Sequence, residues 1–185
     1  ISSVAYDGSQ VYPDTYSLAI SDPTTIDGVN IEKKFEDKTG KVVFSTRFII
    51  TSKSEDSVIS IGNGNQKAIS LKTTETDFVT GKGTVIKKDY KENLWYTLKV
   101  VADVEAKKAD IYLNYQKVLS DVPFESNITS LNTIRIETSV RKTTEMRIDD
   151  VQVYDDITPT DYVPAPQPVK PEGGLEVGMQ IDRKS

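Results

Sequence analysis

The chain has 185 residues and contains neither cysteine nor histidine. Without cysteine, it has no disulfide framework and no thiolate chemistry. Without histidine, it can form no Ser-His-Asp or Cys-His triad, no histidine-ligated zinc site and no imidazole acid–base pair. No apolar run approaches the ~18 residues of a membrane span. The net charge of −5, with lysines and acids interspersed, is typical of a solvated surface and disfavours a nucleic-acid partner.

What the sequence does contain is strand periodicity. Apolar residues recur at every second position over 41–51 and 96–104, a period that predicts strands with one buried face. Turn residues such as Gly62-Asn63-Gly64-Asn65 separate the apolar runs. Only 104–108 has helical character, and it is too short to form a stable helix. Further strands are expected at 16–20, 29–35, 58–61, 68–73, 84–88, 134–136 and 146–154. Together these segments predict an all-β fold, a two-sheet antiparallel sandwich.

Proline marks the C-terminal boundary of the predicted sandwich. Five of the eight prolines fall between Thr158 and Pro171, and alternating prolines favour an extended polyproline II spacer. We therefore expect a sandwich domain over 1–157, a proline-rich linker over 158–174, and the start of a neighbouring module or a disordered tail over 175–185. Because the chain starts at Ile1 without a methionine or a leader, we also expect it to be part of a longer protein.

Three segments carry a resemblance to a known fold. The run 95–104 opens with Trp-Tyr, 109–118 follows it as the next strand of a hairpin, and the last run, 147–154, ends with Ile-Asp-Asp-Val-Gln-Val-Tyr. This pattern resembles the concanavalin-A/laminin-G-like jelly roll. More narrowly, it resembles the carbohydrate-binding modules appended to bacterial polysaccharide lyases and glycoside hydrolases, above all the pectinase-associated and levan-binding types. The resemblance implies that Trp95 is a packing residue.

The same resemblance implies a secreted bacterial protein with a non-catalytic function. Such a module binds a plant or microbial polysaccharide and raises the effective concentration of a covalently linked enzyme, here a pectin-degrading lyase or a similar enzyme, at its substrate. The module is expected to be monomeric. The alternative is a surface adhesion domain or a structural spacer of an extracellular multimodular protein. An adhesion domain would expose apolar patches, whereas the outward positions of the clearest strands are mostly polar.

Sequence motifs for polysaccharide cleavage are missing. Jelly-roll hydrolases carry a Glu-x-Asp-x-x-Glu strand, and Glu75-Thr76-Asp77 matches only its first part. Jelly-roll lyases use a Gln-x-His strand, which a chain without histidine cannot supply. We therefore expect no catalytic residues and no enzymatic activity. A pair of carboxylates brought together only by tertiary contact would escape this test.

Candidate sugar-binding residues follow from the chemistry of sugars. Planar polar side chains form paired hydrogen bonds with vicinal hydroxyls, and aromatic faces stack on sugar rings. An arginine-rich site would also suit uronate carboxylates, as in pectic ligands. For each residue the alternative is a cross-strand ion pair or an ordinary turn. The predicted polysaccharide-binding residues are Arg47, Arg135, Glu137, Arg141, Asn63, Asn65, Gln66, Tyr90 and Tyr115, and both tyrosines are expected to be exposed.

A structural calcium ion is the predicted cofactor. Ca²⁺ takes six to eight oxygen ligands, mainly from carboxylates and backbone carbonyls. In the modules that the chain resembles, such an ion joins the N-terminal segment to the aspartate of the last strand, which places Asp149 at the site with Asp150 beside it. Asp27 is the predicted ligand from the N-terminal side, with Asp22 and Asp7 as alternatives. Equally, Asp149 could cap backbone amides without any metal.

Overall fold

The computed structural model describes residues 3–7, 17–22, 28–138 and 144–156. This part of the chain contains strands and turns but no helix, and so no helix that could cross a membrane. The strands are β1 (Ser3–Asp7), β2 (Ser17–Asp22), β3 (Asn30–Lys38), β4 (Lys41–Ser52), β5 (Val58–Asn63), β6 (Gln66–Thr73), β7 (Phe78–Thr80), β8 (Val85–Lys87), β9 (Trp95–Asp103), β10 (Lys108–Leu113), β11 (Gln116–Pro123), β12 (Leu131–Glu137) and β13 (Thr144–Asp155).

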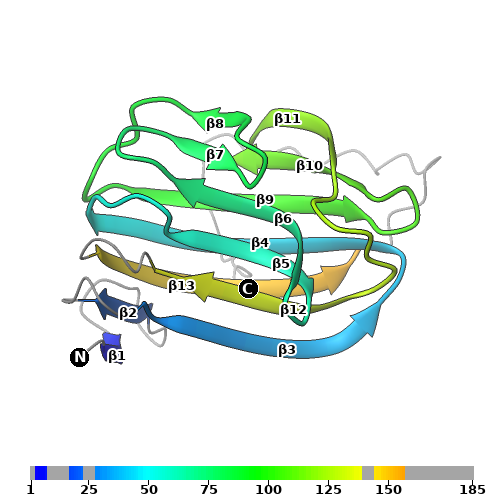
Figure 1. Ribbon diagram of the computed structural model, residues 1–185, viewed down its shortest axis with the longest axis horizontal. Helices are drawn as coiled ribbons and strands as arrows, with labels where there is room; N and C mark the ends of the chain where they lie inside the picture. The colour runs from blue at the N-terminus through cyan, green and yellow to red at the C-terminus, as the bar shows by residue number, and fades with distance from the viewer. Residues whose placement is uncertain (1–2, 8–16, 23–27, 139–143, 157–185) are drawn as a thin grey trace, which may run out of the picture.

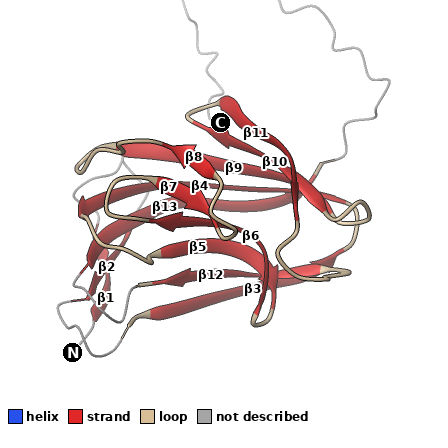
Figure 2. Cartoon of the chain, turned by 45° about the horizontal axis from the view of Figure 1, so that its top comes forward, coloured by secondary structure: helices blue, strands red, loops and turns tan. Residues whose placement is uncertain are grey.

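The strands form two antiparallel sheets that lie face to face (Figures 1 and 2). One sheet has seven strands in the order β1-β2-β13-β4-β9-β10-β11, and the other has six in the order β3-β12-β5-β6-β7-β8. The predicted all-β, two-sheet antiparallel sandwich is therefore confirmed. Three strands, β1, β7 and β11, were not expected from the sequence. β7 is only three residues long, and β11 is largely exposed, so neither has a clear apolar period.

Apolar side chains from both sheets form the core. β9 alternates strictly between buried and half-buried positions, as its sequence period of two predicts. At one end of the core, the ring of Phe78 stacks on Tyr90 with their centroids 4.2 Å apart. Phe78 also meets Phe48 and Tyr96 edge-on, at 5.3 and 5.1 Å. Geometries of this kind add a favourable term to that of the buried area.

The outer face of the six-stranded sheet follows from the strand register. Ile59 and Ile61 point into the core, so Ser60 between them points outward. Arg135 on β12 pairs with Ser60, and Glu32 on β3 pairs with Arg135. The register therefore sets three rows of outward residues across β3, β12, β5 and β6: Lys34, Thr133, Gly62 and Lys67; Glu32, Arg135, Ser60 and Ser70; and Asn30, Glu137, Val58 and Lys72. We call this surface the polar face.

Candidate functional site

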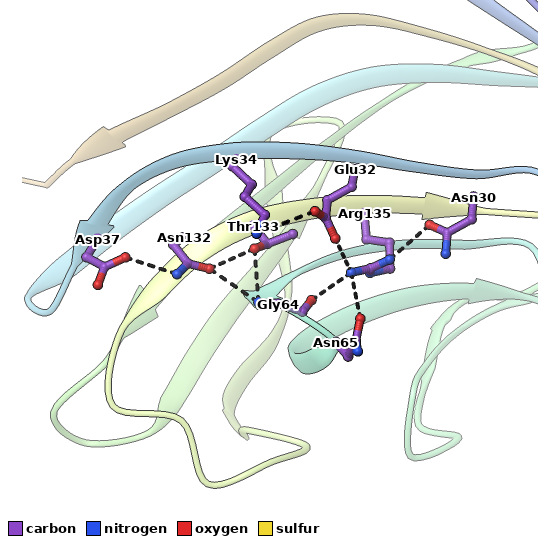
Figure 3. A network of polar contacts seen from close by, with 9 residues as sticks. All are labelled: Asn30, Glu32, Lys34, Asp37, Gly64, Asn65, Asn132, Thr133 and Arg135. Carbon is purple, nitrogen blue, oxygen red and sulfur yellow. Dashed lines mark hydrogen bonds and ion pairs between the residues drawn. The ribbon is translucent and has the colours of Figure 1, made fainter.

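Arg135 lies at the centre of a hydrogen-bond network at one end of the polar face (Figure 3). Its Nη1 donates to Asn30 Oδ1 at 3.0 Å, and its Nη2 donates to the carboxylate of Glu32. Nη2 also donates to the carbonyl oxygen of Gly64 at 2.9 Å and to Asn65 Oδ1 at 3.2 Å. One guanidinium therefore ties β12 to β3 and to the turn between β5 and β6. Since the Arg135 side chain is only 9% exposed, it acts from beneath the surface.

The same turn is held by a second set of contacts. The backbone N–H of Gly64 donates to Thr133 Oγ1 at 3.0 Å and to Asn132 Oδ1 at 3.3 Å. Asn132 Nδ2 in turn donates to Asp37 at 3.0 Å. The asparagine amides that meet at this end of the sheet are thus fixed by the surrounding strands, which is the condition for a preorganised binding surface.

An ion pair spans the middle of the polar face. Lys67 lies in the first row and Glu137 in the third, so the contact between them passes over the central row that contains Ser60 and Ser70. Lys67 Nζ lies 2.9 Å from Glu137 Oε1. That oxygen is buried and accepts no hydrogen bond of normal geometry from the described residues, so its contact with Lys67 is ionic. Both serines are 2% exposed.

Glu125 adds a further carboxylate to this face, beside those of Glu32 and Glu137. Its backbone N–H donates to the carbonyl of Ala68 at 2.9 Å. Ala68 lies in the first part of β6, which does not pair with β7. Its Oε1 accepts from the outward-facing Ser70 Oγ at 3.0 Å. Burial raises the pKa of Glu125, although the hydrogen bonds from Ser70 and the charges of Lys67 and Lys82 oppose that shift.

Gly81 makes room for the Glu125 carboxylate. A Cβ atom at residue 81 would lie 2.1 Å from Glu125 Oε1, closer than any real contact allows. A Gly81→Ala substitution is therefore expected to push the carboxylate toward solvent. Because burial is the main cause of the raised pKa of Glu125, that pKa is expected to fall toward its ordinary value.

Carboxyl titration by ¹³C NMR measures this shift. Gly40→Ala is the matched control, because a Cβ atom at residue 40 would meet nothing within 4 Å. An unchanged Glu125 pKa in the Gly81→Ala protein would show that the carboxylate keeps its place despite the added methyl group.

The outer face of the seven-stranded sheet holds a different charged group. Arg47 on β4 lies over the ring of Trp95, 4.7 Å from its centroid. Its Nη1 is 3.8 Å from a carboxylate oxygen of both Asp149 and Asp150. Asp149 Oδ1 accepts from the backbone N–H of Asp150 at 2.8 Å, whereas the buried Oδ2 accepts no hydrogen bond within the described residues. Burial raises the pKa of Asp149.

This geometry bears on the calcium prediction without deciding it. The described residues contain no group of three or more acids that could hold a metal ion. Asp27, the proposed third ligand, lies outside them. Asp149 does accept from a neighbouring backbone amide, as the metal-free alternative expects. Calcium stays a prediction.

An open hollow of about 310 Å³ lies over the seven-stranded sheet, away from the polar face. Four aspartates line it, and two of them are paired with lysines. Lys108 Nζ is 2.9 Å from Asp121, and Lys117 Nζ is 3.2 Å from Asp110. The polar face, with its buried and differently paired carboxylates, is the stronger candidate site.

The predicted sugar-binding residues fall into several groups. Arg135, Glu137 and Asn65 lie together on the polar face, with the exposed Gln66 next to Asn65 at the start of β6. Asn63 is used internally, since its Nδ2 donates to Ser130 Oγ at 2.9 Å. Arg47 lies on the opposite sheet, so it cannot contribute to the same site. Arg141 lies outside the described residues.

The two predicted tyrosines have opposite environments. Tyr115, in the turn between β10 and β11, is 81% exposed, as expected. The prediction that Tyr90 is exposed was wrong, because its ring stacks on Phe78 and the residue is 0% exposed. Burial raises the pKa of Tyr90 to about 12. The sequence placed Tyr90 near a turn, and it gave no sign that the turn folds back over the core.

Sequence reasoning missed several residues of the polar face. Glu125 follows Pro123 and Phe124 in a segment without strand periodicity, and Lys67 has the pattern of a solvent-exposed strand residue. Asn30 and Glu32 lie on an exposed edge strand. No local signal marks these positions, because their proximity arises from strand pairing alone.

No protein-family model matches the sequence, and no curated protein does. Solved structures do match. A sialidase superposes with a TM-score of 0.69 at 13% identity over 84% of this chain, but the chain spans only 17% of that protein. The catalytic domain of a GH131 β-glucanase from Podospora anserina has a TM-score of 0.59 at 13% identity, covering 82% of this chain and 78% of that one. The fold is a concanavalin-A-like jelly roll.

A marine PL7 alginate lyase from Zobellia galactanivorans matches this jelly roll with a TM-score of 0.56 at 11% identity. The match covers 79% of this chain and 85% of the lyase. At such identities the comparisons establish the fold alone. The predicted pectinase-associated or levan-binding type is not shown by any of them.

These matches contradict the prediction of a non-catalytic module attached to an enzyme. The glucanase catalytic domain and the alginate lyase are matched over most of their own length. A jelly roll of this size is thus the scaffold of complete catalytic domains. The inference from missing sequence motifs was wrong because it tested only motifs, of carboxylates or of a Gln/His pair, whose residues all lie on one strand. In the structure, Glu125 and Glu137 come from a loop and from β12.

Proposed function

We propose that this jelly roll is a catalytic domain that hydrolyses a polysaccharide on its polar face. The supporting observation is that Glu125 and Glu137 differ in environment while sharing Lys67 as a charged neighbour. Burial raises the pKa of Glu125, so this carboxyl group retains a proton to higher pH. Glu137 instead lies in an ion pair with Lys67.

Glycoside hydrolysis needs such a division of roles. A protonated carboxylic acid donates its proton to the leaving oxygen of the glycosidic bond, while an ionised carboxylate activates water or attacks the sugar carbon. We assign the first role to Glu125 and the second to Glu137. Ser70 orients the Glu125 carboxyl group through its hydrogen bond, and Lys67 holds the Glu137 carboxylate in place through their ion pair. Neither histidine nor a metal is needed in this scheme.

Elimination, the chemistry of a lyase, has less support. It requires a base that removes a proton from carbon, commonly tyrosine or histidine, and the chain has no histidine. Among the described tyrosines, Tyr90 and Tyr96 are in the core, and none occupies a position in the three rows of the polar face. Because the proposed substrate is a polysaccharide, we also propose that the protein acts outside the cell.

Incubation with barley β-glucan, xylan, alginate and polygalacturonate tests the proposal. Hydrolysis is expected to release new reducing ends from at least one of them without the ultraviolet absorbance of unsaturated sugars. Unsaturated products would show that the protein cleaves its substrate by elimination and not by hydrolysis. If no polysaccharide yields new ends over a broad pH range, the catalytic assignment fails.

A further inference from the structure

Arg135 orients the two asparagine amides that flank it. A guanidinium has N–H donors and no acceptor, so each amide must turn its oxygen toward Arg135. The Oδ1 atoms of Asn30 and Asn65 do this, at 3.0 and 3.2 Å. The Nδ2 group of each amide is then directed away from the guanidinium, as Figure 3 shows. Neither Nδ2 donates to another residue within the described part of the chain.

Glu32 supplies an acceptor beside these two donors. One of its oxygens accepts from Arg135, and the other lies 3.7 Å from Lys34 Nζ. The Glu32 side chain is 34% exposed, so it lies at the surface where a ligand could reach it. The guanidinium itself is buried and already serves acceptors of the protein. Arg135 is therefore a positioning residue. From the sequence, we expected its guanidinium to bind a uronate carboxylate, but its N–H groups already donate to acceptors of the protein.

From this arrangement we infer a hydroxyl-binding subsite made of Asn30, Glu32 and Asn65. Two amide donors beside one carboxylate acceptor suit vicinal hydroxyls, because each hydroxyl both accepts and donates a hydrogen bond. The ligand class is the uncharged sugar unit of a polysaccharide. This inference rests on one part of the proposed function, namely that a polysaccharide binds to the polar face.

Charge selects against an acidic sugar at the same place. Arg135 is neutralised by Glu32, so the subsite offers no unpaired guanidinium to a uronate or a sulfate ester. The carboxylate of Glu32 would repel either anion. Lys34 does little to offset this repulsion, because its side chain is 70% exposed and its ion pair with Glu32 is weakened by the surrounding water. Specificity of this kind comes from the group that rejects the wrong ligand as well as from those that hold the right one.

Affinity electrophoresis of the whole chain in gels that contain barley β-glucan, alginate or dextran sulfate tests the inference. The key variants are Asn30→Asp and Asn65→Asp, alone and together, since an aspartate keeps the acceptor for Arg135 but loses the outward donor. Asn127→Asp is the matched control. Asn127 is exposed in a different loop, and its Oδ1 likewise accepts from a cation, Lys107 Nζ, at 2.7 Å.

The wild type and the control are expected to be retarded by β-glucan and not by the two acidic polymers. Each single substitution is expected to weaken binding to β-glucan about 10-fold, the effect of losing one good hydrogen bond. Unchanged retardation of the double variant overturns the subsite, as does retardation only by alginate, only by dextran sulfate or by nothing. This experiment measures binding and not cleavage. If the variants lose binding as expected but no polysaccharide is cleaved, the catalytic proposal is refuted and the subsite stands.

Discussion

A Glu125→Gln protein is expected to release reducing ends about 10²- to 10⁴-fold more slowly than the wild type, the usual contribution of a general acid. Glutamine fills the same volume and can still accept the hydrogen bond from Ser70 Oγ, but it has no proton to give to the leaving oxygen. Initial rates with the polysaccharide that the wild type cleaves fastest measure the effect. Glu105→Gln is the control, because Glu105 lies exposed in the turn between β9 and β10.

The same variant makes a prediction about pH and stability. The pKa of Glu125 is raised in the folded state, so the folded protein binds the proton more tightly than the unfolded chain does. The free energy of unfolding of the wild type should therefore fall as pH rises from the unfolded-state pKa through the folded-state pKa. Glutamine does not titrate, so Glu125→Gln should remove this decrease and be the more stable protein above that range. Urea unfolding at several pH values measures it.

A rate loss together with a stability gain would identify Glu125 as a group held in place for chemistry at the expense of stability. Full activity in the Glu125→Gln protein would remove the general acid from the proposed mechanism. A loss of both activity and stability would indicate that the carboxyl group supports the fold instead.

The largest effect on stability is expected from Phe78→Ala. Phe78 is fully buried, and its ring contacts Tyr90, Phe48 and Tyr96. Truncation removes the buried ring and leaves a cavity among the three remaining aromatic residues. Substitutions of this type cost about 3–5 kcal/mol of unfolding free energy. Guanidinium chloride unfolding should show a lower midpoint with an unchanged slope, which indicates lost stability rather than a changed unfolded state.

Tyr115→Ala serves as the aromatic control for this experiment. Tyr115 is 81% exposed, so its truncation is expected to change the free energy of unfolding by less than about 0.5 kcal/mol. A loss below about 1 kcal/mol in Phe78→Ala would mean that the core collapses around the missing ring. Such a result would contradict the close packing of Phe78 against the three other rings.

The sequence by itself determined the fold class and most of the strands. Alternation over 41–51 and 96–104 appears in the structure as β4 and β9, because a strand with one face in the core must repeat every second residue. The resemblance of the last strand to a jelly roll also agrees with the structural matches. Strands without that period, such as the exposed β11, stayed hidden.

The composition of the site was decided by the tertiary structure. Arg135 and Glu137 could be named from β12 alone, because two outward charges on one strand are visible as a local pattern. Their partners could not be named. Lys67 reaches Glu137 across β5, and Glu125 reaches Ser70 from a loop 55 residues later in the chain. Such pairs depend on strand order and register, which arise from long-range backbone pairing and leave no trace in local periodicity.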